Sequence, residues 1–345
     1  MNSLNYIGSK RTLFDKILKT CQENIPDLAS HTFMDLFAGT GYVGFNMQPH
    51  VCNTYANDLE YYSFVINKAL HSCNYSEEIA KMISTMNGLP GVKGLVYNHF
   101  SNHSECERMF FTNENAMKCD AIRQHIQQLY EDKICDQPTF YFLVASLLVS
   151  IDKVANTSCV YGAYLKEFKT SALKPLVLLP IHTKTTISTT NNIVYNGKAE
   201  DVCKNGADIV YMDPPYNNRQ YSANYSPLNY IAHYDGTVEL TGKTGLINGY
   251  NRSDFSKKGE VANAFQTLID EVKCKYMILS YNNEGIMDYN NLKKMMEKRG
   301  ALKIYKILYK KFKAQMTVDI ANVYEYLWVL EVGKEGTATV EHIIE

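Results

Sequence analysis

The sequence feature that most restricts the fold is an apolar run that leads directly into a glycine-rich turn. Residues 32–38 are mostly apolar and indicate a buried strand, and the turn after them is Gly39-Thr-Gly-Tyr-Val-Gly44. This G-x-G-x-x-G pattern is typical of strand–turn–helix units that bind dinucleotides, because glycine lets the backbone approach a ligand closely. The pattern occurs in many proteins, so it predicts an α/β fold and a nucleotide-like ligand without fixing which ligand.

Strands and helices are expected to alternate along most of the remaining chain. Apolar segments with turn residues at their ends predict strands at 54–58, 208–213, 276–281, 302–312 and 324–332, with helices after the first two strands and around 261–272. Parallel strands joined by helices form a doubly wound sheet, which binds its ligands at the carboxyl ends of the strands. The predicted fold class is therefore α/β, with a doubly wound, Rossmann-like sheet.

One connection between two of the predicted strands is much longer than a simple crossover. The stretch between the helix after the second strand and the strand that ends at Asp213 far exceeds the dozen or so residues that a crossover needs. Within it, the apolar run 140–151 follows Asp136 and Pro138, which are typical start signals of a helix. We expect an inserted, mostly helical subdomain at 75–190, and one domain built from residues 1–74 and 191–345.

Composition restricts the class of protein further. The chain has 345 residues, of which 46% are hydrophobic and 21% charged, so it can bury a large core. No stretch approaches the roughly 18 consecutive apolar residues of a membrane helix, and no signal peptide is visible at the start. We expect a cytoplasmic protein without membrane association. The nine cysteines are scattered and form no Cys-x-x-Cys pair, so neither a metal site nor a disulfide framework is expected.

The second motif follows the strand that ends at Asp213, where the sequence is Asp213-Pro214-Pro215-Tyr216. Two prolines cannot continue a sheet and lack N–H donors, so the turn presents a carboxylate and carbonyl acceptors beside an aromatic ring. Such a group suits a planar amine, because Asp213 and the Pro214 carbonyl can each accept one N–H while Tyr216 stacks on the ring. A Pro-Pro pair alone would indicate only a strand-ending turn. Together with the upstream D-x-F-x-G-x-G segment, the motif favours a catalytic site.

The two motifs in this order resemble the alpha-type DNA adenine methylases. These enzymes use S-adenosylmethionine to methylate the N6-amine of adenine at specific DNA sites, and an inserted target-recognition region separates their two motifs. The resemblance covers nearly the whole chain, and further matching segments are 5–13, 57–58, 108–115, 156–165, 218–221 and 280–285. It implies a methyltransferase with S-adenosylmethionine as cofactor and double-stranded DNA as substrate.

The resemblance also implies a set of cofactor-binding residues. Lys10 of the N-terminal segment would pair with the carboxylate of the cofactor. The glycine turn would approach the methionine part, and Asp58 would accept hydrogen bonds from the ribose hydroxyls. The full predicted set is Tyr6, Lys10, Asp35, Phe37, Gly39, Gly41, Asp58 and Asp213.

This chain departs from the family pattern at one cofactor position. Where the family often has an acidic residue near the adenine of the cofactor, this chain has Lys198. Either Glu200 or Asp201 would have to replace that residue, or the contact would be absent.

The implied reaction is a direct transfer of the methyl group to the amine of an adenine flipped out of the duplex, with catalytic residues Asp213, Pro214, Pro215 and Tyr216. The insertion would read bases through polar residues that include Arg108, Asn113 and Arg123. Residues Arg219, Gln220 and Tyr221 would lie beside the flipped base. The run 293–313 holds nine basic residues and one Glu, and its lysines, Lys310 and Lys311 among them, would contact phosphates.

Other interpretations of the sequence stay open at this point. The same amine site would serve adenine in RNA or the N4-amine of cytosine in DNA. An inactive DNA-binding protein with this fold and a dinucleotide-dependent oxidoreductase are alternatives from other classes. For the main interpretation we expect the modification enzyme of a restriction–modification system, acting as a monomer, with any cognate restriction endonuclease a separate protein.

Overall fold

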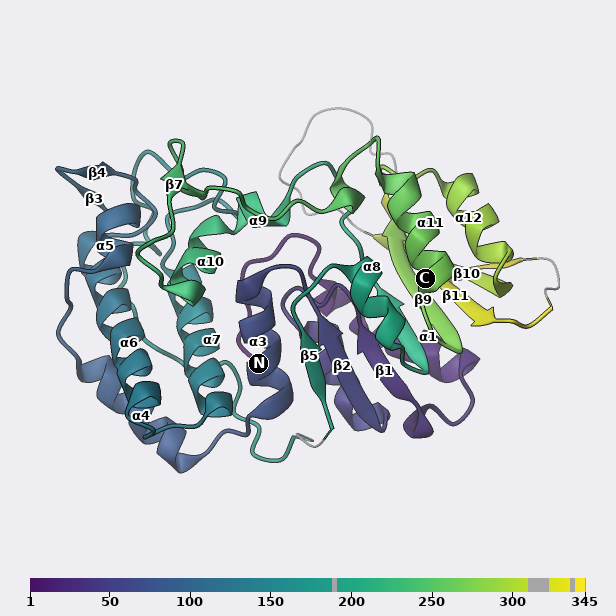
Figure 1. The fold of residues 1–345 in the computed structure, drawn as a ribbon, viewed down its shortest axis with the longest axis horizontal. Helices are drawn as coiled ribbons and strands as arrows, with labels where there is room; N and C mark the ends of the chain where they lie inside the picture. The colour runs from purple at the N-terminus through teal and green to yellow at the C-terminus, as the bar shows by residue number, and fades with distance from the viewer. Residues whose placement is uncertain (188–190, 310–322, 336–338, 345) are drawn as a thin grey trace.

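The structure is a computed structural model that describes residues 1–187, 191–309, 323–335 and 339–344. Within these residues, one eight-stranded sheet has the order β12-β10-β11-β9-β6-β1-β2-β5 and forms the centre of the molecule (Figure 1). Its strands are β1 (Thr32–Asp35), β2 (Asn53–Asn57), β5 (Ile193–Tyr195), β6 (Ile209–Met212), β9 (Tyr276–Asn282), β10 (Gly300–Tyr309), β11 (Val323–Val332) and β12 (Val340–Ile344).

The sheet is parallel from β5 to β9 and mixed beyond it. Strands β5, β2, β1, β6 and β9 pair in parallel, whereas β11 runs antiparallel to both β9 and β10. Strand β12 pairs with β10 in parallel at the edge. The predicted strands are confirmed where they lie within the described residues, and the sheet is antiparallel at this end. An apolar pattern marks a strand without marking the direction of its neighbours, and doubly wound sheets often carry an antiparallel edge.

Helices cover both faces of the sheet because successive strand residues point to opposite sides. Phe33 of β1 packs in the layer of α1 (Phe14–Asn24) and α2 (Tyr42–Met47). Its neighbour Met34 packs on the opposite face of the sheet. Helix α3 (Tyr61–Ser72) lies on the side of α2, and the opposite face carries α8 (Ala199–Val202), α11 (Val261–Glu271) and α12 (Tyr289–Glu297). The prediction of a doubly wound α/β fold is confirmed.

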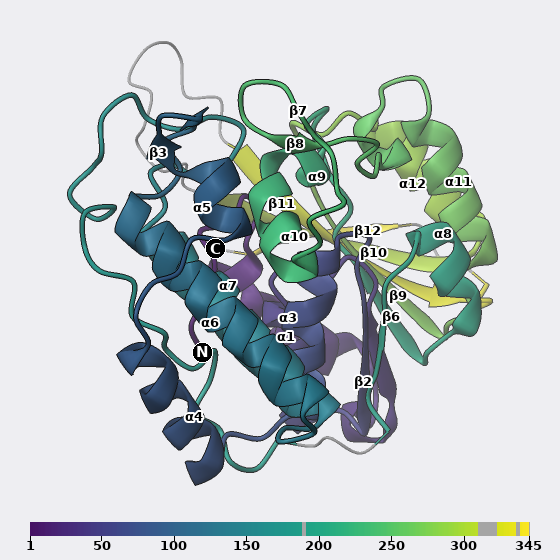
Figure 2. The same cartoon turned by 60° about the vertical axis from the view of Figure 1, so that its left-hand side comes forward.

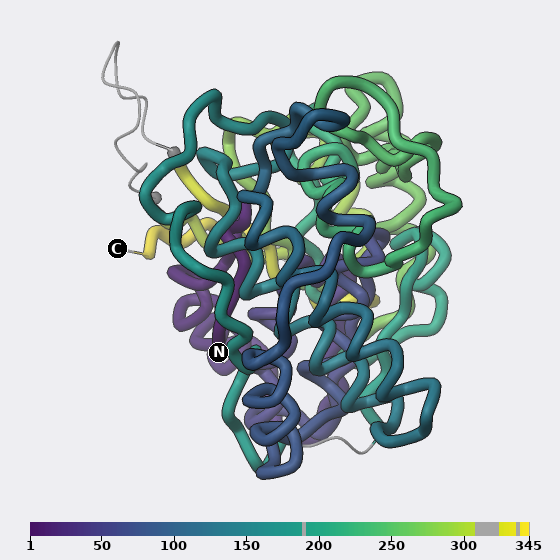
Figure 3. The backbone as a smooth tube through the Cα atoms, turned by 90° about the vertical axis from the view of Figure 1, so that its left-hand side faces the viewer, coloured from purple at the N-terminus to yellow at the C-terminus, as the bar shows by residue number. Residues whose placement is uncertain are grey.

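Four helices make up most of the regular structure described between α3 and β5, whereas residues 154–187 form no helix or strand. This segment forms α4 (Glu77–Gly88), α5 (Leu95–Phe100), the short strands β3 (Asn102–His103) and β4 (Cys106–Glu107), α6 (Asn113–Glu131) and α7 (Gln137–Lys153). Helix α7 begins where its start signals predict, because the Asp136 side chain accepts a hydrogen bond from the Thr139 N–H at 2.9 Å. Figure 2 and Figure 3 show these helices stacked outside α3, on the side away from the sheet.

The core of this helical segment is continuous with the rest of the molecule. Helices α3 to α7 contribute to one buried apolar cluster, which also includes residues of α10 (Ser226–His233). Between β6 and α11 the chain also forms α9 (Tyr221–Asn224) and the hairpin β7 (Leu240–Thr241) and β8 (Leu246–Ile247). Single 3-10 turns occur at Lys10–Thr12, Leu28–Ser30, Gln48–His50, Cys203–Asn205 and Asp254–Ser256. Among the described helices, none combines the length and the apolar character needed to cross a membrane.

Candidate active site

The candidate site lies where the sheet changes its winding direction. Strand β1 is flanked by β2 and β6, and the chain turns away from it to opposite sides, which is where doubly wound sheets open a crevice. A cavity that opens to solvent occupies this place. It is lined by residues that directly follow β1, β2 and β6, namely Phe37, Asp58 and the segment 213–216. Residues 6–8, 197–200, 220–222 and 252–255 complete its wall.

The glycine turn takes the conformation that its sequence predicts. Gly39 and Gly41 have φ angles of 51° and 71°, which side chains rarely tolerate. A Cβ at Gly39 would lie 3.0 Å from the ring of Tyr6, and one at Gly41 would lie 2.6 Å from Leu70 and 2.7 Å from Asn67 of α3. Neither glycine lines the cavity. Their small size therefore serves close contacts within the protein, and their predicted contact with the cofactor stays a prediction.

Asp58 combines the position and the free acceptors that a ribose needs. Its Oδ2 accepts the Gly39 N–H at 2.7 Å and its Oδ1 accepts the Glu60 N–H at 2.8 Å, so two backbone donors orient the carboxylate. Burial raises the pKa of Asp58, and these hydrogen bonds oppose that shift. Each oxygen keeps further acceptor capacity toward the cavity that Asp58 lines.

Asp35 lies beneath the turn and does not line the cavity. It is 2% exposed, its Oδ2 accepts the Gly44 N–H at 3.3 Å, and its Oδ1 has no hydrogen-bond partner. Burial, reinforced by the nearby charge of Asp213, raises the pKa of Asp35 to about 8. The geometry gives Asp35 a role in holding the turn, and direct contact with the cofactor stays a prediction.

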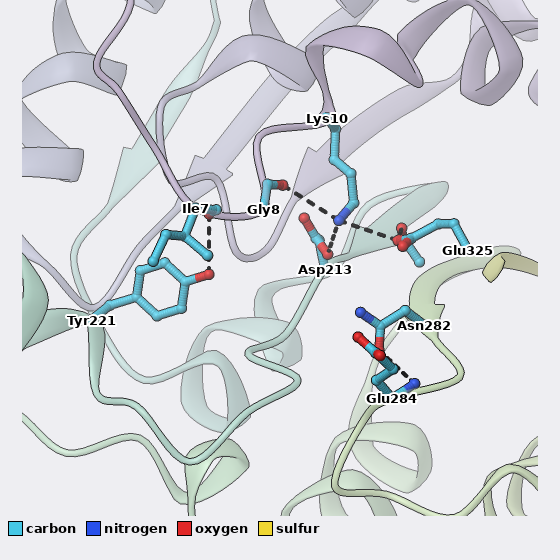
Figure 4. Close-up of polar contacts among 9 residues, drawn as sticks. Ile7, Gly8, Lys10, Asp213, Tyr221, Asn282, Glu284 and Glu325 are labelled. Atoms are coloured by element: carbon cyan, nitrogen blue, oxygen red, sulfur yellow. Dashed lines mark hydrogen bonds and ion pairs between the residues drawn. The ribbon is translucent and has the colours of Figure 1, made fainter. Parts of the chain in front are cut away.

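Asp213 and Lys10 meet in a buried charge cluster (Figure 4). Lys10 Nζ lies 2.9 Å from Asp213 Oδ1 and 3.2 Å from Glu325 Oε1, and it donates a hydrogen bond to the Gly8 carbonyl at 3.4 Å. Burial alone would lower the pKa of Lys10, but the two carboxylates raise it well above its usual range. Burial raises the pKa of Asp213 to about 6, and Lys10 opposes this shift. In this structure Lys10 is bound to protein carboxylates, and its predicted pairing with the cofactor stays a prediction.

Aromatic rings form the wall next to this cluster. The ring of Tyr6 stacks on Tyr225 with centroids 4.9 Å apart and lies 5.4 Å from the ring of Tyr221. Tyr221 donates its hydroxyl to the Ile7 carbonyl at 3.2 Å, which ties the segment after Asp-Pro-Pro-Tyr to the N-terminal turn. The Asp-Pro-Pro-Tyr motif thus faces a cavity with acceptors on one side and flat apolar surfaces on the other, a combination that suits a planar base.

The cavity contains residues that the sequence did not single out. Arg252, Asp254 and Phe255 reach it from the loop before α11, and Phe255 packs edge-on against Phe37 with centroids 5.1 Å apart. Glu60 also lines it, and burial raises the pKa of Glu60 to about 7. No motif or spacing marks these positions, because only the fold brings that loop back over the glycine turn.

The structure also distinguishes the two acidic candidates near Lys198. Glu200 lines the cavity together with Lys198, whereas Asp201 does not. Burial raises the pKa of Glu200. The position therefore favours Glu200 over Asp201 for a contact with the cofactor. Among the described residues, no group of three or more His, Cys, Asp or Glu side chains is arranged to hold a metal ion.

The predicted DNA-binding residues fall into different environments. Arg219 is exposed beside the cavity, and Gln220 binds the backbone of Ser253 through both of its amide atoms, at 3.1 and 2.8 Å. Arg108 donates to the carbonyls of His99, Gly242 and Lys243, which ties α5 to the β7–β8 hairpin. Asn113 is half-buried at the start of α6. Lys310 and Lys311 lie outside the described residues.

Arg123 does not lie on the surface, where a DNA contact requires it, and that prediction is wrong. Its side chain is 2% exposed, and its guanidinium donates to the carbonyls of Ile231 and Ala232, each at 3.2 Å. It also lies over the rings of Phe140 and Tyr234, at 5.5 and 5.3 Å. A basic residue in a polar segment suggests a surface contact, but here it joins α6 to the end of α10.

The cavity fits the predicted cofactor. It combines an acceptor pair at Asp58, a carboxylate at Glu200 and the ring of Phe37. These groups match ribose hydroxyls, an amino group and a purine ring.

Comparison with known proteins supports the same assignment. Residues 6–295 match the profile of the D12 class N6 adenine-specific DNA methyltransferases. The chain is 40% identical over 339 residues to the Type II methyltransferase M.NlaIII of Neisseria lactamica, covering 95% of this chain and 99% of that protein. It is 37% identical over 342 residues to M.CviAII of Paramecium bursaria Chlorella virus 1, covering 96% and 99%. M.FokI of Planomicrobium okeanokoites is 34% identical over 345 residues, covering 95% of this chain and 52% of that protein.

These matches confirm the predicted family, the methyltransferase activity and the use of S-adenosylmethionine. They exclude the alternative of a dinucleotide-dependent oxidoreductase, because the profile extends over the glycine turn and the Asp-Pro-Pro-Tyr motif together. The chain belongs to the D12 class of N6 adenine-specific DNA methyltransferases.

Proposed function

We propose that the cavity binds S-adenosylmethionine and a flipped-out adenine side by side, and that Asp213, Pro214, Pro215 and Tyr216 carry the transfer. The observation that supports this most directly is the place of Asp213, at the end of β6 on the wall of the cavity and within 2.9 Å of Lys10. The prolines have no N–H, so the backbone at 214–215 offers only carbonyl acceptors to an amine.

The proposed mechanism relies on positioning and charge. The N6-amine is a weak nucleophile because its lone pair is delocalised into the ring. Asp213 and the Pro214 carbonyl each accept a hydrogen bond from one of its two N–H groups. This favours a tetrahedral nitrogen with its lone pair directed at the methyl donor. Tyr216 stacks on the base, and Asp213 stabilises the positive charge that develops on the amine. The bound cofactor supplies an electrophilic methyl group on its sulfonium. The proton leaves to solvent after transfer.

The cofactor is proposed to contact Tyr6, Phe37 and Asp58 directly, because all three line the cavity. Lys10 does not line it and binds Asp213 and Glu325, so we propose that Lys10 orients Asp213. Asp35, Gly39 and Gly41 act mainly by shaping the turn. For the contact that the family makes through an acidic residue, we propose Glu200, because it lines the same cavity as Asp58. Lys198 lines the same cavity as Glu200.

The test of the catalytic assignment is Asp213→Ala. We expect kcat to fall by at least about 100-fold, because the variant loses a preorganised acceptor that acts in the transition state. Stabilisation by S-adenosylmethionine in thermal-shift measurements should persist. The matched control is Asp201→Ala, an exposed aspartate near the cavity that does not line it, and its kcat should be unchanged. A nearly wild-type kcat for Asp213→Ala would refute the assignment.

For the DNA, we propose that residues 75–190 form the target-recognition subdomain. Arg219 is exposed and adjacent in sequence to Gln220, which lines the cavity, so we propose that Arg219 contacts DNA. Arg108 and Asn113 are further proposed contacts, and Lys310 and Lys311, outside the described residues, stay a prediction. Gln220 and Tyr221 act by holding the pocket wall, since both side chains already bind neighbouring backbone atoms. The substrate is double-stranded DNA in this proposal.

In the cell, we propose a cytoplasmic, monomeric modification enzyme of a Type II restriction–modification system, since the relatives carry Type II names. Incubating the protein with S-adenosylmethionine and unmethylated genomic DNA, followed by single-molecule mapping of modified bases, tests the substrate. Adenine methylation at one short sequence is the expected result. Methylated cytosine, or methylation of RNA alone, would contradict the proposal. A nuclease that this methylation blocks would identify the cognate endonuclease.

A further inference from the structure

The buried cluster at Lys10 contains one carboxylate more than a structural ion pair needs. Glu325 enters it from β11, on the antiparallel side of the sheet, far in sequence from every motif. The side chains of Lys10, Asp213 and Glu325 are only 6%, 17% and 9% exposed. Two carboxylates therefore share one ammonium in a poorly hydrated place. Burying such an excess charge costs free energy, so stability alone does not explain Glu325.

Glu325 is held in place from its own side of the sheet. Ser280 of β9 donates its hydroxyl to Glu325 Oε1 at 2.5 Å, and Lys10 Nζ lies 3.2 Å from the same oxygen. Ser280 is fully buried. Figure 4 shows Lys10 between the two carboxylates, with Asp213 on one side and Glu325 on the other. The carboxylate of Glu325 is thus fixed opposite Asp213, with the ammonium between them.

We propose that Glu325 is a positioning residue for methyl transfer: it shares the Lys10 ammonium with Asp213 and so leaves Asp213 able to accept the amine of the target base. The inference rests on the proposed role of Asp213. If Lys10 paired with Asp213 alone, the ammonium would compete fully with the amine for that carboxylate. Glu325 reduces this competition, and it acts through Lys10 without touching the substrate.

Several groups act on Asp213, but only one of them would change in the test. The charged and titratable side chains that face Asp213 from the surrounding elements are Lys10, Glu325, Asp35, Tyr211 and Tyr221. Lys10 lowers the pKa of Asp213, whereas the negative charge of Glu325 raises it. Removing the charge of Glu325 should therefore make Asp213 easier to deprotonate, and the direction of this effect is opposite to that expected from general damage to the site.

The experiment is Glu325→Gln, studied as a pH profile of kcat/KM with unmethylated DNA. Glutamine has nearly the same shape and still accepts the Ser280 hydroxyl, but it is neutral. We expect kcat to fall about 10-fold, and the acidic limb of the profile to move down by about one pH unit, as for the loss of a nearby like charge. Glu325→Asp keeps the charge, so its acidic limb should stay at the wild-type pH although kcat falls.

The control is Glu331→Gln on the same strand, where the glutamate forms a surface ion pair with Lys334, and it should change neither quantity. An acidic limb that stays in place in Glu325→Gln overturns the inference, whatever happens to kcat. If Glu325→Gln does not fold, a shifted limb in Glu325→Asp overturns it instead. A fully active Asp213→Ala would refute the proposed function itself, so the two failures are distinguishable.

Discussion

Gly41 shows how one residue fixes the packing between the glycine turn and α3. Its φ of 71° lies in the left-handed region, and the position faces Leu70 and Asn67 of α3 at less than 3 Å from where a Cβ would stand. Asn67 in turn donates to the Gly39 carbonyl at 3.4 Å, so α3 and the turn are packed as one unit. At the residue scale, the glycine turn is therefore a packing device as well as a binding motif.

Gly41→Ala should lower the free energy of unfolding by roughly 2–3 kcal/mol, because the new Cβ meets both strain in φ and contact with α3. Urea denaturation measures the change. The matched control is Gly242→Ala, since Gly242 has nearly the same φ of 69° but nothing within 4 Å of a Cβ. The free energy of unfolding of that variant should fall by about 1–2 kcal/mol, because the new side chain meets only the strain of the left-handed φ. Equal losses in both variants would contradict the packing role of Gly41.

At the scale of elements, Arg123 decides how the helical layer is joined. Its guanidinium binds two carbonyls at the end of α10, a helix that directly follows the catalytic motif and α9 in the chain. The last carbonyls of a helix have no partner within it, and Arg123 supplies one from α6. These two hydrogen bonds of Arg123 link the inserted helices to the segment that carries Tyr221 and Tyr225.

Arg123→Ala should destabilise the fold by roughly 2–4 kcal/mol, since two buried carbonyls lose a charged donor. Its DNA affinity, measured on the folded protein, should keep the wild-type salt dependence. Arg219→Ala is the matched control at an exposed arginine, and its stability should change by less than about 0.5 kcal/mol. A wild-type unfolding curve for Arg123→Ala, together with a reduced salt slope of DNA binding, would restore the original prediction of a DNA contact.

At the scale of the whole molecule, buried carboxyl groups join distant segments. Asp152 of α7 accepts the Asn5 N–H at 2.8 Å and the Tyr161 hydroxyl at 2.9 Å, and Glu60 accepts hydrogen bonds from Ser222 and Asn229. Burial raises the pKa of Asp35 to about 8, of Glu60 to about 7 and of Asp152 to about 6. Near neutral pH these carboxyl groups are therefore partly protonated in the native state, whereas the same groups are deprotonated in the unfolded chain.

The free energy of unfolding should therefore fall as the pH rises from 7 to 8, because the native state binds more protons than the unfolded chain over this interval. His71 and His182 act in the opposite direction, since burial lowers their pKa values to about 4 whereas the unfolded imidazoles bind protons near their usual pKa of about 6.5. Above pH 7 these unfolded imidazoles are mostly deprotonated, so they do not reverse the sign. Urea denaturation at several pH values measures the slope. Asp35→Asn should flatten it, whereas the exposed control Asp15→Asn should not. A stability that rises over this interval would contradict the prediction.

Much of the protein could be predicted from the sequence because its signals are local. The strand before Asp35, the start of α7 at Asp136 and the motif at Asp213 each depend on residues adjacent in the chain, and the structure places them as expected. The order of the two motifs along the chain indicated the family. Local patterns of this kind determined the α/β fold, the inserted helical segment and the presence of acceptors for an amine.

Only the tertiary structure decided which charged residues act together. Glu325, Phe255 and Glu60 carry no motif, and they reach the site because β11, the loop before α11 and the start of α3 converge there. Arg123 has the composition of a surface residue, but the packing of α6 against α10 buries it. Burial and pairing between distant segments are properties of the folded chain, because they depend on which surfaces meet, and that is what a linear pattern does not encode.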